Sequence, residues 1–269
     1  MSFVLVDRPV TEIVVLTLNR PERMNAMAFD VMLPLRDRLR EISHDNSVRA
    51  VILTGAGAGF CSGADQADAG APPHIAGLTP VTIALRAMEL LDDIILTLRN
   101  LHQPLIAAIN GAAIGGGFCL SMACDVRIAS TAAYFRAAGI NNGLTASELG
   151  LSYLLPRAIG ASRAFEIMLT GRDVSAAEAD RIGLVSAMVE PEALLDTCVT
   201  MGQRMAAFSR PGLELTKKTL WSGLDAASLQ QHMAQEGLGQ LFVRMMTGNF
   251  EEATVARKEG RPPVFRDAR

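Results

Sequence analysis

Short apolar runs that lead into glycine constrain this fold more than any other feature of the sequence. Residues 50–54 (AVILT) and 105–109 (LIAAI) carry no charge, and a glycine-rich loop follows each run. Such runs are typical of strands buried on both faces, which occur mainly in parallel sheets covered by helices. The sequence therefore predicts an α/β fold with parallel strands at its centre.

The rest of the chain alternates between strand and helix patterns up to about Thr145 and is helical almost throughout after it. Between residues 55 and 80 no period is sustained, so a long functional loop is expected there. The sequence Ser175–Glu178 is a capping box that opens a short helix, and Gly183 closes this helix. The remaining expected strands are 3–6, 13–18 and 126–129, and the remaining expected helices are 29–42, 81–101, 116–123, 190–208, 212–222 and 226–246.

The length of 269 residues suits one large domain, and a hydrophobic content of 49% excludes a disordered chain. We expect a core over residues 1–208 and a helical C-terminal region over 209–269. The pair Pro262-Pro263 should end the ordered part. Residues 104–126 approach membrane length, but Asn110, Asp125 and several glycines interrupt them, which favours a buried strand and helix.

Charge, cysteine and histidine content exclude several classes of function. A net charge of −3 provides no basic field for a nucleic acid. The four cysteines show no metal or redox spacing, so reduced thiols in a cytoplasmic protein are the simplest interpretation. The four histidines are scattered, and no metal site is expected. The N-terminus lacks the pattern of a signal peptide.

Two glycine-rich loops are the candidate sites. The first, Leu53–Asp65, contains GAGAGF, which differs from the dinucleotide fingerprint by having Phe60 at the sixth position. The second, Ala108–Asp125, has three glycines, Gly115–Gly117, before a helix. These glycines either permit tight packing alone or expose backbone N–H groups to a ligand. If both loops direct one N–H to a single oxygen, they form an oxyanion hole.

Five segments stand in order along the chain: NRPERMNAM at 19–27, GFCSGAD at 59–65, AAINGAAIGGG at 107–117, LTGRDVSAAEADRIGLV at 169–185 and RPPVF at 261–265. Together they resemble the enoyl-CoA hydratase/isomerase (crotonase) superfamily. The resemblance implies a spiral of ββα units with a C-terminal helical region, assembled as a homotrimer or a dimer of trimers. It implies an acyl-CoA thioester as ligand, in fatty-acid or related metabolism, with no cofactor besides the coenzyme A of the substrate.

The same resemblance assigns the ligand contacts. The oxyanion-hole donors would be the backbone N–H groups of Ala64 and Gly116. Arg23 would meet a CoA phosphate, unless it is only a solvated surface charge. Asp65 and Asp125 are expected to cap or orient turns. The other implied ligand contacts are Met24, Ala26, Asp65, Gln66 and Cys119.

Both glutamates that hydratases of this family use are absent. The first position holds Cys119 and the second Gly139, so hydration by two carboxylates is disfavoured. The start of a helix can lower the pKa of a thiol such as Cys119, and the alternative is a buried inert cysteine.

Glu148 is the acid that remains nearby. It aligns with a catalytic Asp of dienoyl-CoA isomerases and of 4-chlorobenzoyl-CoA dehalogenase, which would make it a base or nucleophile. The alternative is structural, because Thr145–Glu148 also reads as a capping box. Isomerisation needs one proton carrier and fits a single acid. The first alternative function is a non-catalytic acyl-CoA binder. The second is a serine peptidase using Ser62 or Ser121, which fits less well because no histidine motif accompanies these serines.

Overall fold

The computed structural model describes residues 2–266, and its centre is a six-stranded sheet in the order β1-β2-β3-β5-β7-β10. Strand β1 pairs with β2 in an antiparallel hairpin, and all the other pairs are parallel. Most of the parallel strands are apolar along their length, as burial on both faces requires, although β7 carries Arg127. The strands span Val4–Val10 (β1), Ile13–Leu18 (β2), Ala50–Gly55 (β3), Leu105–Ile109 (β5), Val126–Ser130 (β7) and Ala187–Val189 (β10).

A second, smaller sheet runs beside the first in the order β4-β6-β8-β9. Its first three strands each follow a strand of the large sheet, so the chain repeats a ββα unit. The mixed α/β fold predicted from the sequence is therefore confirmed as a spiral of such units. These strands are Gly59–Cys61 (β4), Ala112–Ile114 (β6), Tyr134–Arg136 (β8) and Val174–Ser175 (β9).

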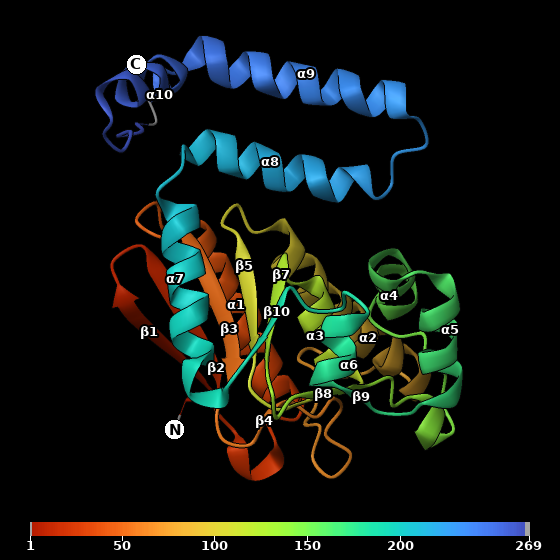
Figure 1. The fold of residues 1–269 in the computed structure, drawn as a ribbon. Coiled ribbons are helices and arrows are strands. Elements are labelled where there is room, and N and C mark those ends of the chain that lie inside the picture. The colour runs from red at the N-terminus through yellow and green to blue at the C-terminus, as the bar shows by residue number, and fades with distance from the viewer. Residues whose placement is uncertain (1, 267–269) are drawn as a thin grey trace.

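Helices cover both faces of the large sheet (Figure 1). One face packs with α1, α2 and α3 in the main hydrophobic core, and the other packs with α7 in a smaller core around Ile13, Ile52 and Leu194. The helices up to this point are α1 (Phe29–Ser43), α2 (Pro80–Asn100), α3 (Gly116–Ala123), α4 (Leu151–Ile159), α5 (Ala161–Thr170), α6 (Ala176–Arg181) and α7 (Leu194–Ala206).

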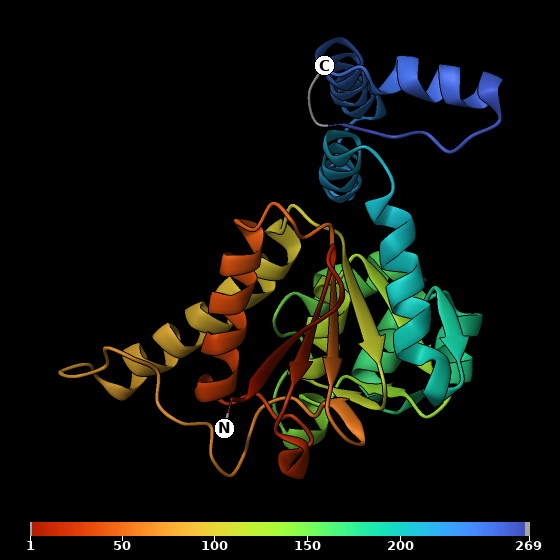
Figure 2. The same ribbon diagram turned by 90° about the vertical axis from the view of Figure 1, so that its left-hand side faces the viewer.

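The last three helices form a separate layer above the core, α8 (Arg210–Gly223), α9 (Leu229–Met246) and α10 (Asn249–Glu259) (Figures 1 and 2). Helix α8 is tied to the core by Asp125, whose carboxylate accepts from Lys217 Nζ at 2.8 Å and from Trp221 Nε1 at 2.6 Å. Helix α9 buries none of its residues. Its Leu238 and Leu241 are 71% and 57% exposed, so this layer presents a large apolar surface.

Most of the expected elements are confirmed within a few residues, including α3 at its stated bounds. The predicted capping box is confirmed in its first half, since Ser175 Oγ accepts from Glu178 N–H at 3.2 Å, whereas the Glu178 carboxylate accepts from Arg172. Two predictions need correction. The 55–80 segment is not wholly loop, because β4 lies within it, and α10 follows the last expected helix. No helix of the described residues is long and apolar enough to cross a membrane.

Candidate active site

The two glycine-rich loops lie against each other. Strand β4 ends at Cys61 and pairs in parallel with β6, so the chain leaves both strands at the same edge of the small sheet. A Cβ placed on Gly63 would lie 2.7 Å from Ile114 O and 3.2 Å from Gly116 N. The backbone of the first loop therefore approaches the start of α3 closely, as glycine at this position allows.

The Ala64 N–H points away from the strand that pairs with it. Met27 pairs with Ala64 in an isolated parallel bridge, in which Met27 N–H donates to Gly63 O at 2.7 Å and Asp65 N–H donates to Met27 O at 3.3 Å. In this pattern the residue between the two bonds directs its own N–H to the opposite side. Among the described residues, neither Ala64 N–H nor Gly116 N–H has a hydrogen-bond acceptor. Two N–H groups from neighbouring loops are thus free for a ligand.

The glycine triplet lets α3 begin in close contact with its surroundings. A Cβ on Gly116 would lie 2.2 Å from Met27 Sδ, and one on Gly117 would lie 2.0 Å from Cys61 O. Gly117 leaves no room for a side chain, because its neighbour is backbone, whereas at Gly116 the Met27 side chain would have to move. The triplet therefore permits tight packing, and the Gly116 N–H has no acceptor among the described residues.

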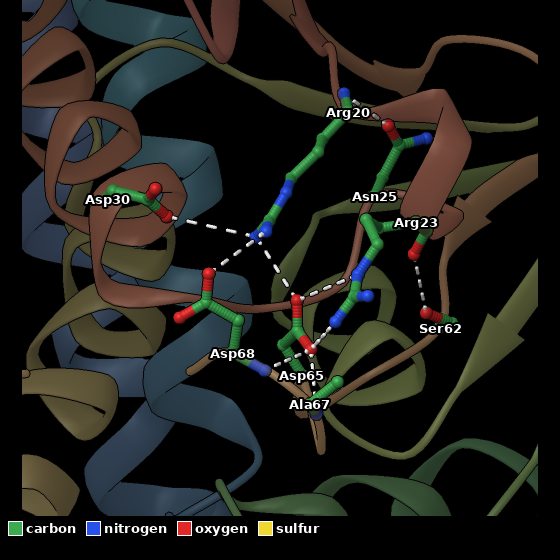
Figure 3. A network of polar contacts seen from close by, with 8 residues as sticks. All are labelled: Arg20, Arg23, Asn25, Asp30, Ser62, Asp65, Ala67 and Asp68. Atoms are coloured by element: carbon green, nitrogen blue, oxygen red, sulfur yellow. Dashed lines mark hydrogen bonds and ion pairs between the residues drawn. The ribbon is translucent and has the colours of Figure 1, made fainter. Parts of the chain in front are cut away.

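Asp65 is the centre of a polar network next to Ala64 (Figure 3). Its carboxylate accepts the backbone N–H groups of Ala67 at 3.0 Å and Asp68 at 2.9 Å, which confirms the expected turn cap. Both guanidinium groups of the NRPER segment reach the same carboxylate. Arg23 forms a bidentate pair with it, and Arg20 Nη1 lies 3.1 Å from Asp65 Oδ2.

Charge pairing shifts the pKa values of this network. The hydrogen bond from Arg23, together with the Asp68 and Ala67 N–H groups, lowers the pKa of Asp65 to about 2. The same hydrogen bond raises the pKa of Arg23. Asp65 is therefore ionised throughout the physiological range. Arg23, whose side chain is 35% exposed, is a paired charge at the edge of the site and not a freely solvated one.

Glu148 faces the glycine triplet. Its Oε1 would lie 3.4 Å from a Cβ on Gly115, whose Cβ would also be 4.0 Å from Gly63 Cα. The predicted capping box at Thr145–Glu148 is wrong, because helix α4 begins only at Leu151, after the N-cap Gly150. Thr145 Oγ1 instead accepts from Ser147 N–H at 3.0 Å.

Two consecutive residues after Glu148 have left-handed backbone conformations, Leu149 with φ 45° and Gly150 with φ 80°. Leucine adopts this conformation rarely, and such strain is typical of functional sites. This turn delays the start of α4 and leaves the Glu148 side chain beside Gly115 instead of at a helix end. Leu149 itself is buried and packs near Gly116.

Partial burial raises the pKa of Glu148, since the surroundings favour the neutral carboxyl group. No cation pairs with this carboxylate among the described residues, and its oxygens have no hydrogen-bond partner there. A carboxylate with a raised pKa is a stronger base than an exposed one. It is the acid of the described site whose environment suits proton transfer.

This pKa shift predicts how Glu148→Gln changes stability. The folded state binds the proton more tightly than the unfolded state, so wild-type stability falls as pH rises from the unfolded pKa through the raised folded pKa. Glutamine removes that loss. We expect Glu148→Gln to raise the melting temperature at pH 7 relative to the wild type, with a smaller difference at pH 4. Calorimetry at both pH values measures it, and an equal difference at both would contradict the ionisation argument.

Cys119 is fully buried beneath Glu148. Its thiol donates to Gly115 O at 3.2 Å and lies 3.5 Å from Glu148 O, so it joins the triplet to the Glu148 segment. Burial raises its pKa well above the ordinary value, as does the neighbouring Glu148. The structure supports the inert, buried cysteine, and no thiolate forms at the start of α3.

Gly139, at the second expected carboxylate position, has no free space. A Cβ there would lie 1.9 Å from Thr145 O. Ser62 and Ser121 are equally unsuited to nucleophilic attack, because their Oγ atoms donate to Arg23 O at 3.3 Å and Phe118 O at 2.7 Å. The described residues contain no cluster of metal-ligating side chains.

The remaining implied contacts surround this site. Met24 and Gln66 are exposed, whereas Ala26 is 5% exposed. Met24 and Asn25 have left-handed φ values of 48° and 55°, which turn the chain toward the first glycine-rich loop. Sequence reasoning missed the pairing of both arginines with Asp65, because partners 42 and 45 positions apart leave no local pattern.

Comparisons with known proteins agree on one family. The model of the family described as enoyl-CoA hydratase/isomerase matches residues 10–268. A Mycobacterium bovis protein named "Probable enoyl-CoA hydratase echA12" is 71% identical over 267 residues, covering 99% of this chain and 94% of that protein.

Two solved structures are also similar. An enoyl-CoA hydratase/isomerase from Mycobacterium abscessus, described as probable, is 73% identical, with a TM-score of 0.96 and full coverage of both chains. A monofunctional enoyl-CoA isomerase from M. smegmatis is 65% identical, with a TM-score of 0.74, and the match covers 87% of this chain and 99% of that one.

Proposed function

Because the chain belongs to the enoyl-CoA hydratase/isomerase family of acyl-CoA enzymes, we propose that it isomerises the double bond of an enoyl-CoA through a thioester enolate. The observation that carries this proposal is the single carboxylate, Glu148, beside two unpartnered backbone N–H groups. Hydration is disfavoured because neither of the family's two glutamate positions holds an acid. The proposal is supported by the M. smegmatis protein, which is 65% identical and is described as a monofunctional enoyl-CoA isomerase.

In the proposed reaction the thioester oxygen accepts from Ala64 N–H and Gly116 N–H. Glu148 removes a proton from C2 of a 3-enoyl-CoA, and the negative charge moves to the thioester oxygen. The same carboxyl group then returns the proton to C4, so the double bond moves from C3 to C2. Each N–H donor stabilises the enolate-like transition state by about 2.7 to 4 kcal/mol, and the single acid carries the proton in both steps.

We propose that Arg23 binds a phosphate of the coenzyme A. Its pairing with Asp65 does not prevent this, since that pair uses Nε and Nη2 of Arg23. Arg23 Nη1 can meet a phosphate while both arginines stay against the Asp65 carboxylate. The backbones near Met24, Ala26 and Gln66 line the remaining path. No cofactor besides the coenzyme A of the substrate is needed.

We propose a homotrimer or a dimer of trimers, with α8–α10 in the subunit contacts. The support is the apolar surface of this layer, where an 18-residue helix, α9, buries no residue against its own chain. A surface of this kind is typical of an interface. We also propose a cytoplasmic location, since the four cysteines of the described chain are buried free thiols.

Two substrates test the reaction type. We expect trans-3-hexenoyl-CoA to be converted to trans-2-hexenoyl-CoA, followed by the absorbance of the conjugated thioester. With trans-2-hexenoyl-CoA we expect less than about one hundredth of that rate of 3-hydroxyacyl-CoA formation, because one catalytic carboxylate contributes about 10²-fold or more to proton transfer. Rapid hydration of the 2-enoyl substrate would contradict the proposal. Binding of both thioesters without turnover of either would favour the non-catalytic acyl-CoA binder.

A further inference from the structure

The carboxylate of Asp65 has more partners than a turn cap requires. Two backbone N–H groups and two guanidinium groups converge on it, and its side chain is 2% exposed. The other carboxylates near Arg20 are those of Asp30 and Asp68, both at 3.9 Å and 54% and 74% exposed. Asp65 is therefore the fixed centre of the network drawn in Figure 3.

Ala64 directly precedes Asp65. The backbone pairing with Met27 holds Ala64 less firmly on its C-terminal side than on its N-terminal side. Upstream, Met27 N–H donates to Gly63 O at 2.7 Å. Downstream, Asp65 N–H reaches Met27 O only at 3.3 Å, beyond the usual range for such a bond. The Asp65 side chain, anchored to Arg20 and Arg23 on the neighbouring segment, supplies the restraint that this long bond does not.

Electrostatics alone would not favour an acid here. A carboxylate next to the point where a thioester oxygen gains negative charge opposes that charge. The two arginines offset this repulsion, and Arg23 also fixes the carboxylate through charge-assisted hydrogen bonds, while Arg20 contacts it as an ion pair. A buried acid in such a place is explained by what it does to the geometry of the loop.

We propose that Asp65 is a positioning residue, which, clamped by Arg20 and Arg23, holds the Ala64 N–H in the direction of the thioester oxygen. This inference rests on the proposed function. It assigns to the RPER segment a role in shaping the oxyanion hole, in addition to the contact of Arg23 with coenzyme A. A displacement of about 1 Å in such a site can cost about 10²-fold in rate.

Positioning and charge predict opposite signs for Asp65→Asn. Acetoacetyl-CoA is a suitable probe, because its enolate has its own ultraviolet absorbance and carries the charge that an oxyanion hole stabilises. Loss of positioning would raise the pH midpoint of enolate formation in the bound state. Loss of a nearby negative charge, with both arginines left, would lower it. We expect the midpoint to rise by about one unit, a tenfold weaker preference for the enolate.

Kinetics with trans-3-hexenoyl-CoA provide the second measurement. We expect kcat of Asp65→Asn to fall about tenfold or more with KM within about twofold, because the ground-state carbonyl depends less on the N–H direction than the transition state does. The matched control is Asp68→Asn, the same change three positions along the loop on an exposed carboxylate, and we expect it to behave as the wild type. Circular dichroism and the dissociation constant of coenzyme A report on folding.

Should Asp65→Asn not fold, Arg23→Lys separates the same alternatives. This substitution keeps the positive charge and loses the bidentate bond to Asp65. If Asp65 acts by positioning, the pH midpoint of enolate formation should rise, and if it acts only by charge, the midpoint should not change. A wild type that does not shift the enolate midpoint of acetoacetyl-CoA from its value in water would overturn the proposed function itself. If the wild type does shift the midpoint, but the midpoint in Asp65→Asn or Arg23→Lys is equal to or lower than that of the wild type, only the role of Asp65 is overturned.

Discussion

Replacing Glu148 with glutamine should reduce turnover of trans-3-hexenoyl-CoA by about 10³-fold, within the range of 10² to 10⁴ that a positioned acid or base contributes. Glutamine has nearly the same shape and cannot accept a proton at neutral pH. The two backbone N–H groups remain, so the dissociation constant of acetoacetyl-CoA should change by less than about threefold. Stopped-flow or steady-state kinetics and a binding titration measure the two quantities separately.

The matched control for this substitution is Glu192→Gln, at an exposed glutamate that has no ion pair or hydrogen bond among the described residues. We expect wild-type kinetics from it. An unchanged rate in Glu148→Gln would remove this residue from the mechanism, and the reaction would then need another proton carrier. Together with higher stability at pH 7, a slow Glu148→Gln would show that the wild type retains a buried acid at a cost in stability.

Gly139→Ala should destabilise the protein by about 3 kcal/mol or more. The backbone at Gly139 is α-helical, φ −53° and ψ −44°, so alanine suits the conformation. However, its Cβ would lie 1.9 Å from the carbonyl oxygen of Thr145, and the backbone would have to move. Thermal unfolding measures the effect, and a loss of about 6 to 12 °C in melting temperature corresponds to this energy in a large domain.

The control for this prediction is Gly248→Ala, at a glycine with φ −89° and no atom within 4 Å of the added Cβ. We expect about 1 kcal/mol or less from it, the small cost of replacing glycine by alanine at the N-cap of α10. Equal stability of the two variants would mean that the backbone of residues 138–146 can move at little cost to make room for the added Cβ. If the prediction holds, the second hydratase glutamate cannot be restored at position 139 by substitution alone. The absence of a glutamate at position 139 is then a property of the local backbone, whereas at the first position only the residue type, Cys119, differs.

Much of the fold could be predicted because its central strands are apolar on both faces and its helices have a clear period. The smaller sheet was not predicted as a sheet. Strands β4 and β6 are three residues each, GFC and AAI, and such short runs of glycine, alanine and cysteine have no alternation to recognise. Their pairing depends on the two loops lying side by side, which is a tertiary effect. Helix α10 was missed because its apolar residues follow no helical stripe.

The sequence predicted which loops form the candidate site, but not which side chains contact each other within it. The approach of Gly63 to Gly116 follows from two glycine-rich loops at neighbouring strand ends. The direction of Glu148 does not follow from sequence, because a capping box and a catalytic acid give the same residues. The left-handed pair Leu149-Gly150 excludes the capping box, and a leucine in that conformation has no sequence signal.

The two groups that would hold a thioester oxygen and the group that would move a proton come from different parts of the fold. The free amides belong to chain segments that leave the paired strands β4 and β6, where neighbouring backbone fixes them. The acid sits on the segment between β8 and α4, outside that pairing. One architecture can therefore change its reaction by single changes at positions such as 119 or 148, while the backbone groups that would hold the thioester stay in place. Enzymes with this fold can therefore differ in the reaction they catalyse through a different acidic side chain alone, with the backbone unchanged.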